Sequence, residues 1–333
     1  MFRNRAAWIN SRPGVRWRSA GSVPLPGDWI SFKYQGGYYI GLAVKSGFSY
    51  IYWSTNLTTW NSVGFSGVTT DVACDGTYFF CTTDSVFGAA GVYRITIANP
   101  ASQFGYNITA GLVTKTIDWS PGVGKFIIGA VGNVVYNTDA AGTTWSAPIS
   151  LYSSSYVPVQ GAQTDAGVYA LVAEDTTPLL GGVQLFIINS ALSSTGLTFV
   201  QTNYEFNTPG IVPIPGARAP LYVYKKTRHS TQTTQLSTVG RTISAPPTPL
   251  FPGPGFDNVV TIPYTAENLV GIFNSPTTGN VYIIFESGQV WESLDYGVSW
   301  NQTFTVTAGT RLAASGPLGI AILQSSGQLL VSP

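Results

Sequence analysis

The chain has 333 residues, enough for one large domain or two ordinary ones. Hydrophobic residues make up 44% of it and aromatic residues 13%, but charged residues only 9%, well below the roughly 25% of an ordinary soluble domain. The net charge of +1 gives no sign of binding to nucleic acid or to an acidic membrane, and the 37 glycines favour short strands and turns over helices.

The N-terminal segment is basic. Its first 20 residues hold five arginines and no acid, which leaves 11 basic residues against 15 acidic ones in the remainder. Such an arm is either a solvated tail or a contact for an acidic neighbour. It lacks the apolar stretch of a secretory signal, and no window of the chain is long and apolar enough to predict a membrane span.

The two cysteines, Cys74 and Cys81, flank the sequence DGTYFF, which predicts a hairpin with an Asp75-Gly76 turn. In this register Cys74 faces Thr77 and Cys81 lies further along the strand. We therefore expect two small core residues and no disulfide between them. Two unpaired core cysteines do not indicate whether the protein works in an oxidising or a reducing compartment.

Seven segments repeat one pattern along the chain: a first strand rich in small residues, a glycine-bearing turn, and a second strand that is almost wholly apolar. Their starts lie about 40–58 residues apart. The segments are residues 30–43, 71–83, 116–130, 159–173, 211–226, 269–286 and 312–324. A further strand pair follows several of them, and four strands at this period are typical of a β-propeller blade.

We therefore predict an all-β fold, a seven-bladed β-propeller of four-stranded antiparallel blades, as a single domain over residues 1–333. Residues 1–26 are the N-terminal arm and closing strand, residues 27–310 form blades one to six, and residues 311–333 form the last blade. That last blade shows only three strands, so we expect residues 15–20 to supply its outer strand. The apolar second strands should be buried on both faces.

The turns between third and fourth strands share a second pattern, in which a hydroxyl or amide residue is followed by an acid or amide, a glycine and an aromatic residue. The clearest copy is Ser293, Asp295, Gly297 and Trp300, with Ser299 before the tryptophan. Other copies are Asn137, Asp139, Gly142 and Trp145; Ser54, Asn56 and Trp60, without the glycine; residues 193–199, with Phe199; and Asn10, Arg12, Gly14 and Trp17.

This pattern resembles the Asp-box, or BNR repeat, Ser-x-Asp-x-Gly-x-Thr-Trp. Its physical role is local, because the acid accepts backbone hydrogen bonds, the glycine adopts a positive φ, and the aromatic ring inserts between blades. Sialidases are propellers with this repeat. The resemblance implies their fold but stops short of their active site, because the chain lacks the early Arg-Ile-Pro motif and an assignable arginine triad.

A search for chemistry finds little. The single histidine, His229, lies among Lys225, Lys226 and Arg228, which is too few partners for a triad or a zinc site. Glu174 and Asp175 are adjacent acids in an expected loop. We predict no catalytic residues, no metal and no cofactor, and hence a protein that is not an enzyme.

Low charge and an aromatic-rich all-β chain also resemble the virion proteins of tailed bacteriophages. The resemblance implies a non-enzymatic structural propeller in a phage tail, assembled in the host cytoplasm. Its partners would be other tail proteins, further copies in a homo-oligomer or ring, and a glycan or protein of the host surface. The alternative is a bacterial extracellular Asp-box protein that binds or hydrolyses glycans. No nucleic-acid motif is present.

Any ligand should bind at the mouth formed by the loops between second and third strands. The candidate residues there are Lys45, Phe48, Phe87, Glu174, Asp175, Lys225, Arg228, His229 and Glu286. Residues 227–257 predict one weak strand pair and a long extended loop, Pro-rich over residues 241–256, which is either a passive connection or a contact arm.

Overall fold

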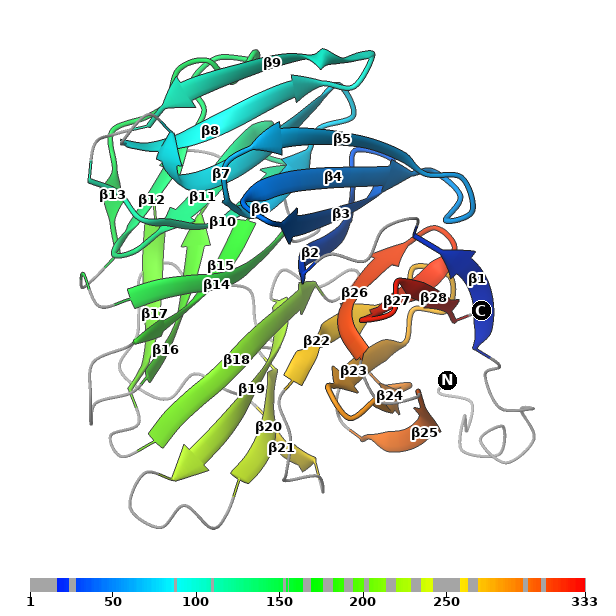
Figure 1. The fold of residues 1–333 in the computed structure, drawn as a ribbon. Helices are drawn as coiled ribbons and strands as arrows, with labels where there is room; N and C mark the ends of the chain where they lie inside the picture. The colour runs from blue at the N-terminus through cyan, green and yellow to red at the C-terminus, as the bar shows by residue number, and fades with distance from the viewer. Residues whose placement is uncertain are drawn as a thin grey trace.

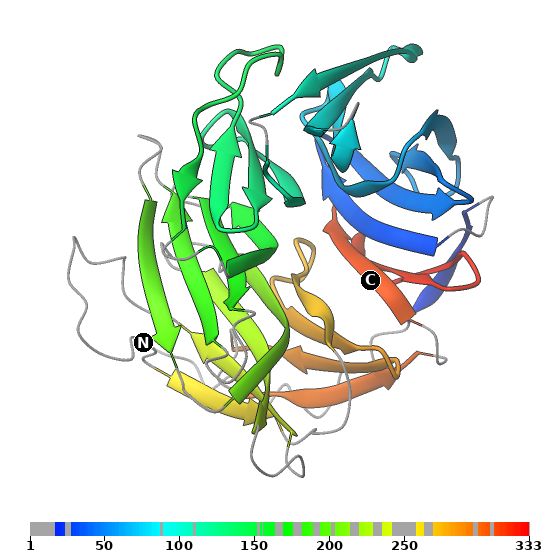
Figure 2. The same cartoon turned by 60° about the vertical axis from the view of Figure 1, so that its left-hand side comes forward.

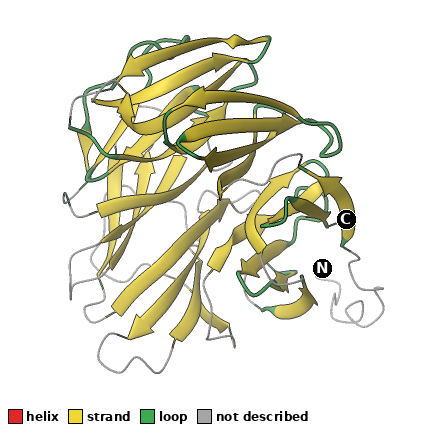
Figure 3. Ribbon diagram, in the orientation of Figure 1, coloured by secondary structure: helices red, strands yellow, loops and turns green. Residues whose placement is uncertain are grey.

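The computed structural model describes residues 17–23, 28–86, 89–108, 111–151, 154, 156–163, 169–175, 182–188, 194–200, 204–213, 220–228, 235–241, 258–262, 269–295, 299–306 and 310–332. Between residues 162 and 269, side chains are described only for Leu171 and Ala173. Every regular element in these ranges is a strand (Figure 3). None of the described residues belongs to a helix that could cross a membrane.

The strands pair as four-stranded antiparallel sheets (Figure 1). Three sheets come from the first part of the chain: β2 (Asp28–Gln35), β3 (Tyr38–Lys45), β4 (Phe48–Ser54) and β5 (Asn61–Ser66); β6 (Thr69–Cys74), β7 (Tyr78–Val86), β8 (Ala89–Thr96) and β9 (Asn99–Asn107); and β10 (Thr114–Ser120), β11 (Lys125–Ala130), β12 (Asn133–Tyr136) and β13 (Ile149–Ser150).

Four more sheets follow. They are β14 (Tyr156–Gln163), β15 (Tyr169–Asp175), β16 (Gly182–Ile188) and β17 (Ser194–Val200); β18 (Tyr204–Pro213), β19 (Pro220–Arg228), β20 (Gln235–Arg241) and β21 (Asn258–Ile262); β22 (Leu269–Asn274), β23 (Val281–Phe285), β24 (Gln289–Ser293) and β25 (Asn301–Thr305); and β26 (Thr310–Gly316), β27 (Gly319–Gln324) and β28 (Gln328–Val331), which the N-terminal β1 (Arg18–Ser22) completes.

The first strands of the sheets face the centre of a ring. Going round the ring, β2 contacts β6, β6 contacts β10, and the series continues through β14, β18, β22 and β26 back to β2. Figure 2 shows the sheets arranged around this centre like the blades of a propeller.

The prediction of seven four-stranded blades needs a correction. All seven sheets are defined by backbone pairing, but only five are described through all four strands with their side chains. Those five begin with β2, β6, β10, β22 and β26. In the sheet that begins with β14 only some side chains are described, and in the sheet that begins with β18 only the backbone is described. Five blades are therefore described in full, not seven.

The second strands are the buried layer of each described blade, as their apolar sequences predict. All five residues of β23 and all six of β27 are buried, and β11 is buried from Phe126 to Ala130. A middle strand with blades packed on both of its faces has no solvent-exposed side, so an alternating polar pattern would be destabilising there.

The hairpin around the cysteines has a different register from the predicted one. Cys74 pairs with Phe79, not Thr77, and Cys81 pairs with Val72. The reason is a turn in which the Asp75 carboxylate accepts hydrogen bonds from the amides of Thr77 and Tyr78, at 2.7 and 2.8 Å. Both thiols are free and buried, which confirms that they are core residues.

The chain ends meet in one sheet. Strand β1 pairs antiparallel with β28, from Arg18 beside Val331 to Ser22 beside Gln328. The strand lies slightly later in the sequence than the expected segment 15–20, because the pairing continues past a register shift after Ser19. Beyond it, the Val23 amide donates to the Gly327 carbonyl at 2.9 Å.

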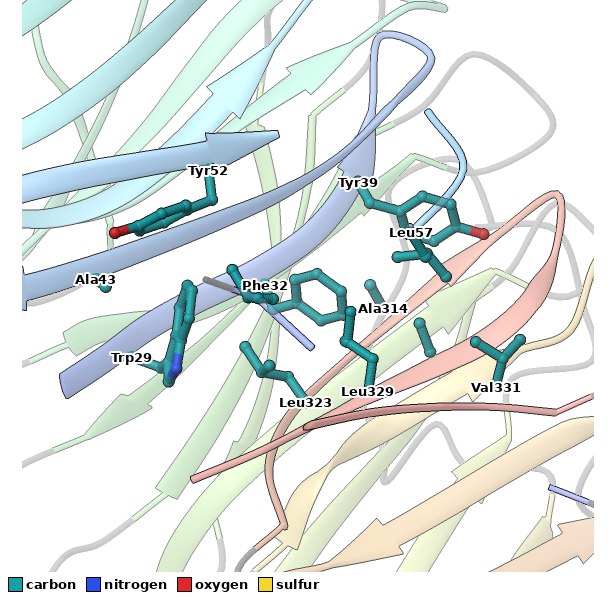
Figure 4. Packing of buried hydrophobic residues seen from close by; sticks show 12 residues of the cluster. Trp29, Phe32, Tyr39, Ala43, Tyr52, Leu57, Ala314, Leu323, Leu329 and Val331 are labelled. Atoms are coloured by element: carbon teal, nitrogen blue, oxygen red, sulfur yellow. The ribbon is translucent and has the colours of Figure 1, made fainter. Parts of the chain in front are cut away.

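The junction between the first blade and the last is an apolar cluster (Figure 4). Its largest members are aromatic side chains of β2, β3 and β4, and they pack against aliphatic side chains of β26, β27 and β28. They include Phe32, Tyr39 and Tyr52 on one side and Leu323 and Leu329 on the other. The ring is thus joined here by the same kind of buried apolar contact that joins blades elsewhere.

Trp17, immediately before β1, packs against the preceding blade. Its ring stacks on Phe304 of β25 at a centroid distance of 5.9 Å and meets the edge of Tyr282 of β23 at 6.4 Å. The aromatic residue of the N-terminal copy therefore lies between two blades. Asn10, Arg12 and Gly14 lie outside the described residues.

The turn after β12 shows how the acid and the aromatic residue act together. The Asp139 carboxylate accepts hydrogen bonds from the amides of Thr143 and Thr144, at 2.8 and 3.0 Å, and from the Thr143 hydroxyl. Trp145 then packs edge-on against Phe80 of the neighbouring blade. A side chain at Gly142, which has a φ of +65°, would clash with the same Phe80 ring.

The corresponding turn of the first blade has no glycine, and a leucine adopts the positive φ there instead. Leu57 has a φ of +64° and is fully buried in the cluster between the first and last blades. The Asn56 side chain accepts hydrogen bonds from the amides of Thr58 and Thr59, and the Trp60 indole donates to the Leu57 carbonyl. Burial of Leu57 thus compensates for a backbone conformation that a non-glycine residue rarely adopts.

The turn after β24 has the expected hydrogen bonds among its described residues. The buried Ser293 hydroxyl donates to Asp295 at 2.8 Å, and Asp295 accepts from the Ser299 amide at 2.8 Å and hydroxyl at 2.6 Å. Trp300 follows directly, whereas Gly297 lies outside the described residues. The weaker copy at 193–199 was wrong, because residues 194–200 form β17 and pair along β16.

The Asp139 turn should make stability depend on pH. Partial burial by itself raises the pKa of Asp139, but the hydrogen bonds from Thr143 and Thr144 outweigh it and lower the pKa to about 2. Because the unfolded pKa is about 3.9, the stabilisation is present above about pH 4 and is lost as the pH falls towards 2.

We expect Asp139→Ala to lower the free energy of unfolding by about 1 kcal/mol at neutral pH. Urea unfolding of the variant and the wild type should show this deficit shrinking from about pH 5 to about pH 2.5. A deficit that stays constant over that range would contradict the assigned role of the carboxylate.

Candidate functional site

The first strands share an irregularity that positions side chains at the ring centre. In six of them the pairing with the second strand shifts by one extra residue close to the start of the strand, and in β18 it shifts further along, between Asn207 and Gly210. In five of these strands the extra residue also lines the central cavity; these residues are Ile30, Thr70, Lys115, Val159 and Val270. A β-bulge re-aims the chain locally, and here it does so at corresponding places in successive blades.

The cavity has a volume of about 890 Å³ and is lined chiefly by the first strands of six sheets. Most of its described lining is apolar or small, as expected where blades converge. Four charged side chains are exceptions: Lys33, Asp71, Lys115 and Asp118. In a chain with 9% charged residues, this concentration at one place marks the cavity as the candidate functional site.

Lys33 connects three blades. Its ammonium lies 2.6 Å from Asp71 Oδ2 on β6 and 2.9 Å from Asp118 Oδ1 on β10, and it also donates to the Ile117 carbonyl at 2.7 Å. The side chains of both aspartates are 8% exposed and that of Lys33 is 22% exposed. The ion pairs are therefore largely removed from water.

Gln35 and backbone amides complete this group, which we call the Lys33 network (Lys33, Gln35, Asp71 and Asp118). The Gln35 amide donates to Asp118 Oδ1 at 3.0 Å, and its carbonyl accepts from the Cys74 amide at 3.3 Å. Asp71 Oδ2 also accepts from the Ile117 amide at 2.9 Å. Each charged group thus has several partners, which a buried ion pair needs in order to be stable.

The electrostatics keep Lys33 charged. Burial by itself lowers the pKa of Lys33, but the carboxylates of Asp118 and Asp71 more than offset it, so that the pKa is raised above its usual value. An ammonium held in this way is not a nucleophile at neutral pH. The arrangement can connect three blades and present a polar patch to a ligand in the cavity.

The sequence-predicted mouth residues lie elsewhere. Lys45 and Phe48 flank the β3–β4 turn and are exposed, and Glu286 is exposed just after β23. Glu174, Asp175, Lys225 and Arg228 lie within β15 and β19 and not in loops, with only their backbone described. Phe87, His229 and residues 242–256 of the Pro-rich segment lie outside the described residues. None of the nine appears in the described cavity lining.

The sequence interpretation missed the Lys33 network. One signal was available: the first strands are rich in small and apolar residues, so Lys33, Asp71 and Asp118 are charges where few others occur. A third buried acid, Glu292, lies away from the cavity and accepts hydrogen bonds from the Tyr282 hydroxyl at 2.5 Å and the Asn280 amide at 2.7 Å. The described residues contain no cluster of three His, Cys, Asp or Glu side chains suited to a metal ion.

The fold is similar to several solved structures. One, described as a Cps50 (Swd1) β-propeller domain from Myceliophteria thermophila, has a TM-score of 0.61 at 11% identity, covering 95% of this chain and 98% of that one. BBS1N in complex with ARL6DN gives 0.57 at 15% identity, with 96% and 98% covered. PorZ, a bacterial surface component of the type-IX secretion system of Porphyromonas gingivalis, gives 0.62 at 12% identity, with 93% and 48% covered.

No protein-family model and no curated protein sequence matches the chain. Identities of 11–15% to the solved structures show the fold alone. Together with the ring of four-stranded sheets, they establish that this chain has a β-propeller fold.

Proposed function

We propose that the chain is a non-enzymatic structural and interaction propeller, a component of a bacteriophage tail that is assembled in the host cytoplasm and incorporated in the virion. It contacts neighbouring tail subunits, including further copies of itself, or the host surface. What supports this proposal is a low-charge surface with apolar side chains exposed on rigid loops.

Phe48 and Val68 illustrate this surface. Their side chains are 49% and 57% exposed. The loops that carry them are fixed to each other, because the Gly67 amide donates to the Gly47 carbonyl at 3.3 Å and the Thr69 hydroxyl donates to Ser49 at 3.0 Å. Apolar groups that are held in place lose little conformational entropy on contact, and a surface with few charges costs less to desolvate.

The similar structures agree with an interaction role. One is a complex of BBS1N with ARL6DN, and another is described as an essential component of a secretion system. Propellers of this shape therefore occur as parts of assemblies, which supports contact with other proteins as the general function of the fold here.

The test is to look for the chain in particles. Antibodies raised against the purified protein should label the tails of purified virions in negative-stain microscopy, and mass spectrometry should detect the chain there. Deleting its gene should leave particles with incomplete tails or with reduced adsorption to the host. Detection in the culture medium and never in virions would contradict the proposal.

Glycan binding or hydrolysis is the second candidate, and the paired carboxylates at the cavity favour it. Asp71 and Asp118 face one cavity, as the acids of a glycosidase do. A panel of sialosides and other aryl glycosides should show no turnover if the structural proposal holds. Turnover that disappears in Asp71→Asn or Glu286→Gln, with an unchanged melting temperature, would establish the hydrolase instead.

A further inference from the structure

Three adjacent blades bring polar side chains to one level of the central cavity. Ser31 and Asp71 directly follow the bulged residue of their strands, β2 and β6, and Lys115 is itself the bulged residue of β10. All three residues line the cavity. Because β2 contacts β6 and β6 contacts β10, these corresponding positions lie next to one another around the ring.

Each of the three side chains has bonding capacity that the described residues do not use. Asp71 Oδ2 meets the Lys33 ammonium at 2.6 Å and the Ile117 amide at 2.9 Å, but Asp71 Oδ1 has no hydrogen-bond partner among the described residues. Within the same ranges the Ser31 hydroxyl and the Lys115 ammonium have neither a hydrogen bond nor an ion pair. Ser31 is only 7% exposed, and leaving a buried polar group unbonded costs free energy that a ligand can recover.

The rest of the described wall is apolar at this level. Strands β14, β22 and β26 contribute Val159, Val270 and Leu312, and the described lining contains no charged residue from these three strands. Ile30 lines the cavity at the same level and is 41% exposed, so the cavity meets solvent there. A ligand that enters at this level therefore meets a polar wall on one side and an apolar wall on the other.

We propose that the cavity binds an apolar zwitterion of the size of a dipeptide. The ligand's ammonium group donates to Asp71 Oδ1 and to the Ser31 hydroxyl, its carboxylate pairs with the Lys115 ammonium, and its apolar side chains lie against Val270 and Leu312. A neutral sugar would leave Lys115 without a counter-charge. A simple anion would lie close to the Asp71 carboxylate, so a ligand with both charges suits the site best.

The spacing of the charged groups and the volume fit a ligand of this length. The Asp71 carboxylate lies beside the Ile117 amide, and Lys115 is two residues before Ile117, which is about 7 Å along β10. Two extended residues of a peptide span about 7 Å as well. The cavity volume of about 890 Å³ is within the usual range for small-molecule sites.

This inference is independent of the proposed tail function, which concerns the outer surface. Isothermal titration calorimetry of the purified full chain with L-leucyl-L-leucine should give one site with a Kd of about 0.1 mM or lower. The N-acetyl derivative lacks the ammonium and the C-terminal amide lacks the carboxylate, so each should bind about tenfold more weakly or worse. Glycylglycine keeps both charges but lacks the apolar side chains, and its Kd should also be at least about tenfold higher.

Two variants assign each end of the ligand to its partner. Lys115→Met should weaken L-leucyl-L-leucine about tenfold and leave binding of the amide unchanged, because the amide has no carboxylate to lose. Ser31→Ala should weaken the dipeptide about threefold and leave binding of the N-acetyl derivative unchanged. The matched control, Lys45→Met, removes an exposed lysine that is not in the described cavity lining and should leave every Kd unchanged.

Absence of heat at about 10 mM dipeptide would overturn the zwitterion site. So would equal affinities for the dipeptide and its two blocked derivatives, a Lys115→Met loss that is as large for the amide, or tighter binding of lactose than of the dipeptide. The proposed tail function is judged separately, by whether the chain is found in virions. A chain that is found in virions and does not bind the dipeptide would reject the zwitterion site alone, and a dipeptide-binding chain never found in virions would reject the tail function alone.

Discussion

Lys33→Met should lower the free energy of unfolding by about 3–5 kcal/mol, because it leaves two largely buried carboxylates without their shared cation. Asp71 and Asp118 would then repel each other across adjoining blades, and their hydrogen bonds with backbone amides and Gln35 would not replace the lost charge. Thermal and urea unfolding should both detect the loss.

Two further variants separate this effect from general damage to the cavity. Lys115→Met removes a lysine that lines the same cavity and has no ion pair among the described residues, so it should change stability by less than about 0.5 kcal/mol. Combining Lys33→Met with Asp71→Asn and Asp118→Asn should recover much of the lost stability, because no uncompensated charge stays buried. If Lys33→Met is as stable as the wild type, the network does not hold the blades together.

Trp17→Ala should cost about 3 kcal/mol and make the protein prone to aggregation. The truncation removes the ring that stacks on Phe304 and abuts Tyr282, and so loosens the segment that leads into β1. With β1 loosened, the edge of β28 becomes available to other chains. Light scattering during thermal unfolding should show both effects.

Trp17→Phe is the matched control. The Trp17 indole nitrogen is buried and has no hydrogen-bond partner among the described residues, so phenylalanine loses little polar contact with them and keeps most of the apolar area. Its stability should lie within about 1 kcal/mol of the wild type. Equal losses in both variants would mean that ring packing is not what fixes the closing strand.

Local rules in the sequence were enough to predict the all-β fold and most of the strand pairs. The continuous apolar run of FIIGA in β11 indicates a strand buried on both faces, and SLDYGVSW indicates a turn pinned by Asp295. Each of these signals lies within about ten residues of the chain, so it can be read without knowing which blades are neighbours.

The candidate site was beyond such rules for a physical reason. Lys33 meets Asp118 across 85 positions in the sequence, and only the ring brings their strands together. The bulges that aim Ile30 and Lys115 at the cavity leave no trace in residue type, because any residue can occupy a bulge. Leu57 was hidden in the same way, since its positive φ is sustained by burial against another blade and not by its own preference.

The pairing of β1 with β28 has a mechanical consequence. Because Arg18 lies beside Val331, the beginning of one strand and the end of the other are at the same end of the pair. Tension applied to the chain on both sides of the propeller would therefore peel the two strands apart, breaking their hydrogen bonds one after another. The same pull on a pair attached at opposite ends would load all of the hydrogen bonds at once. The β1–β28 pair therefore offers little resistance to force applied through the two chain ends. We expect the ring to resist force better when the force is applied to its other blades.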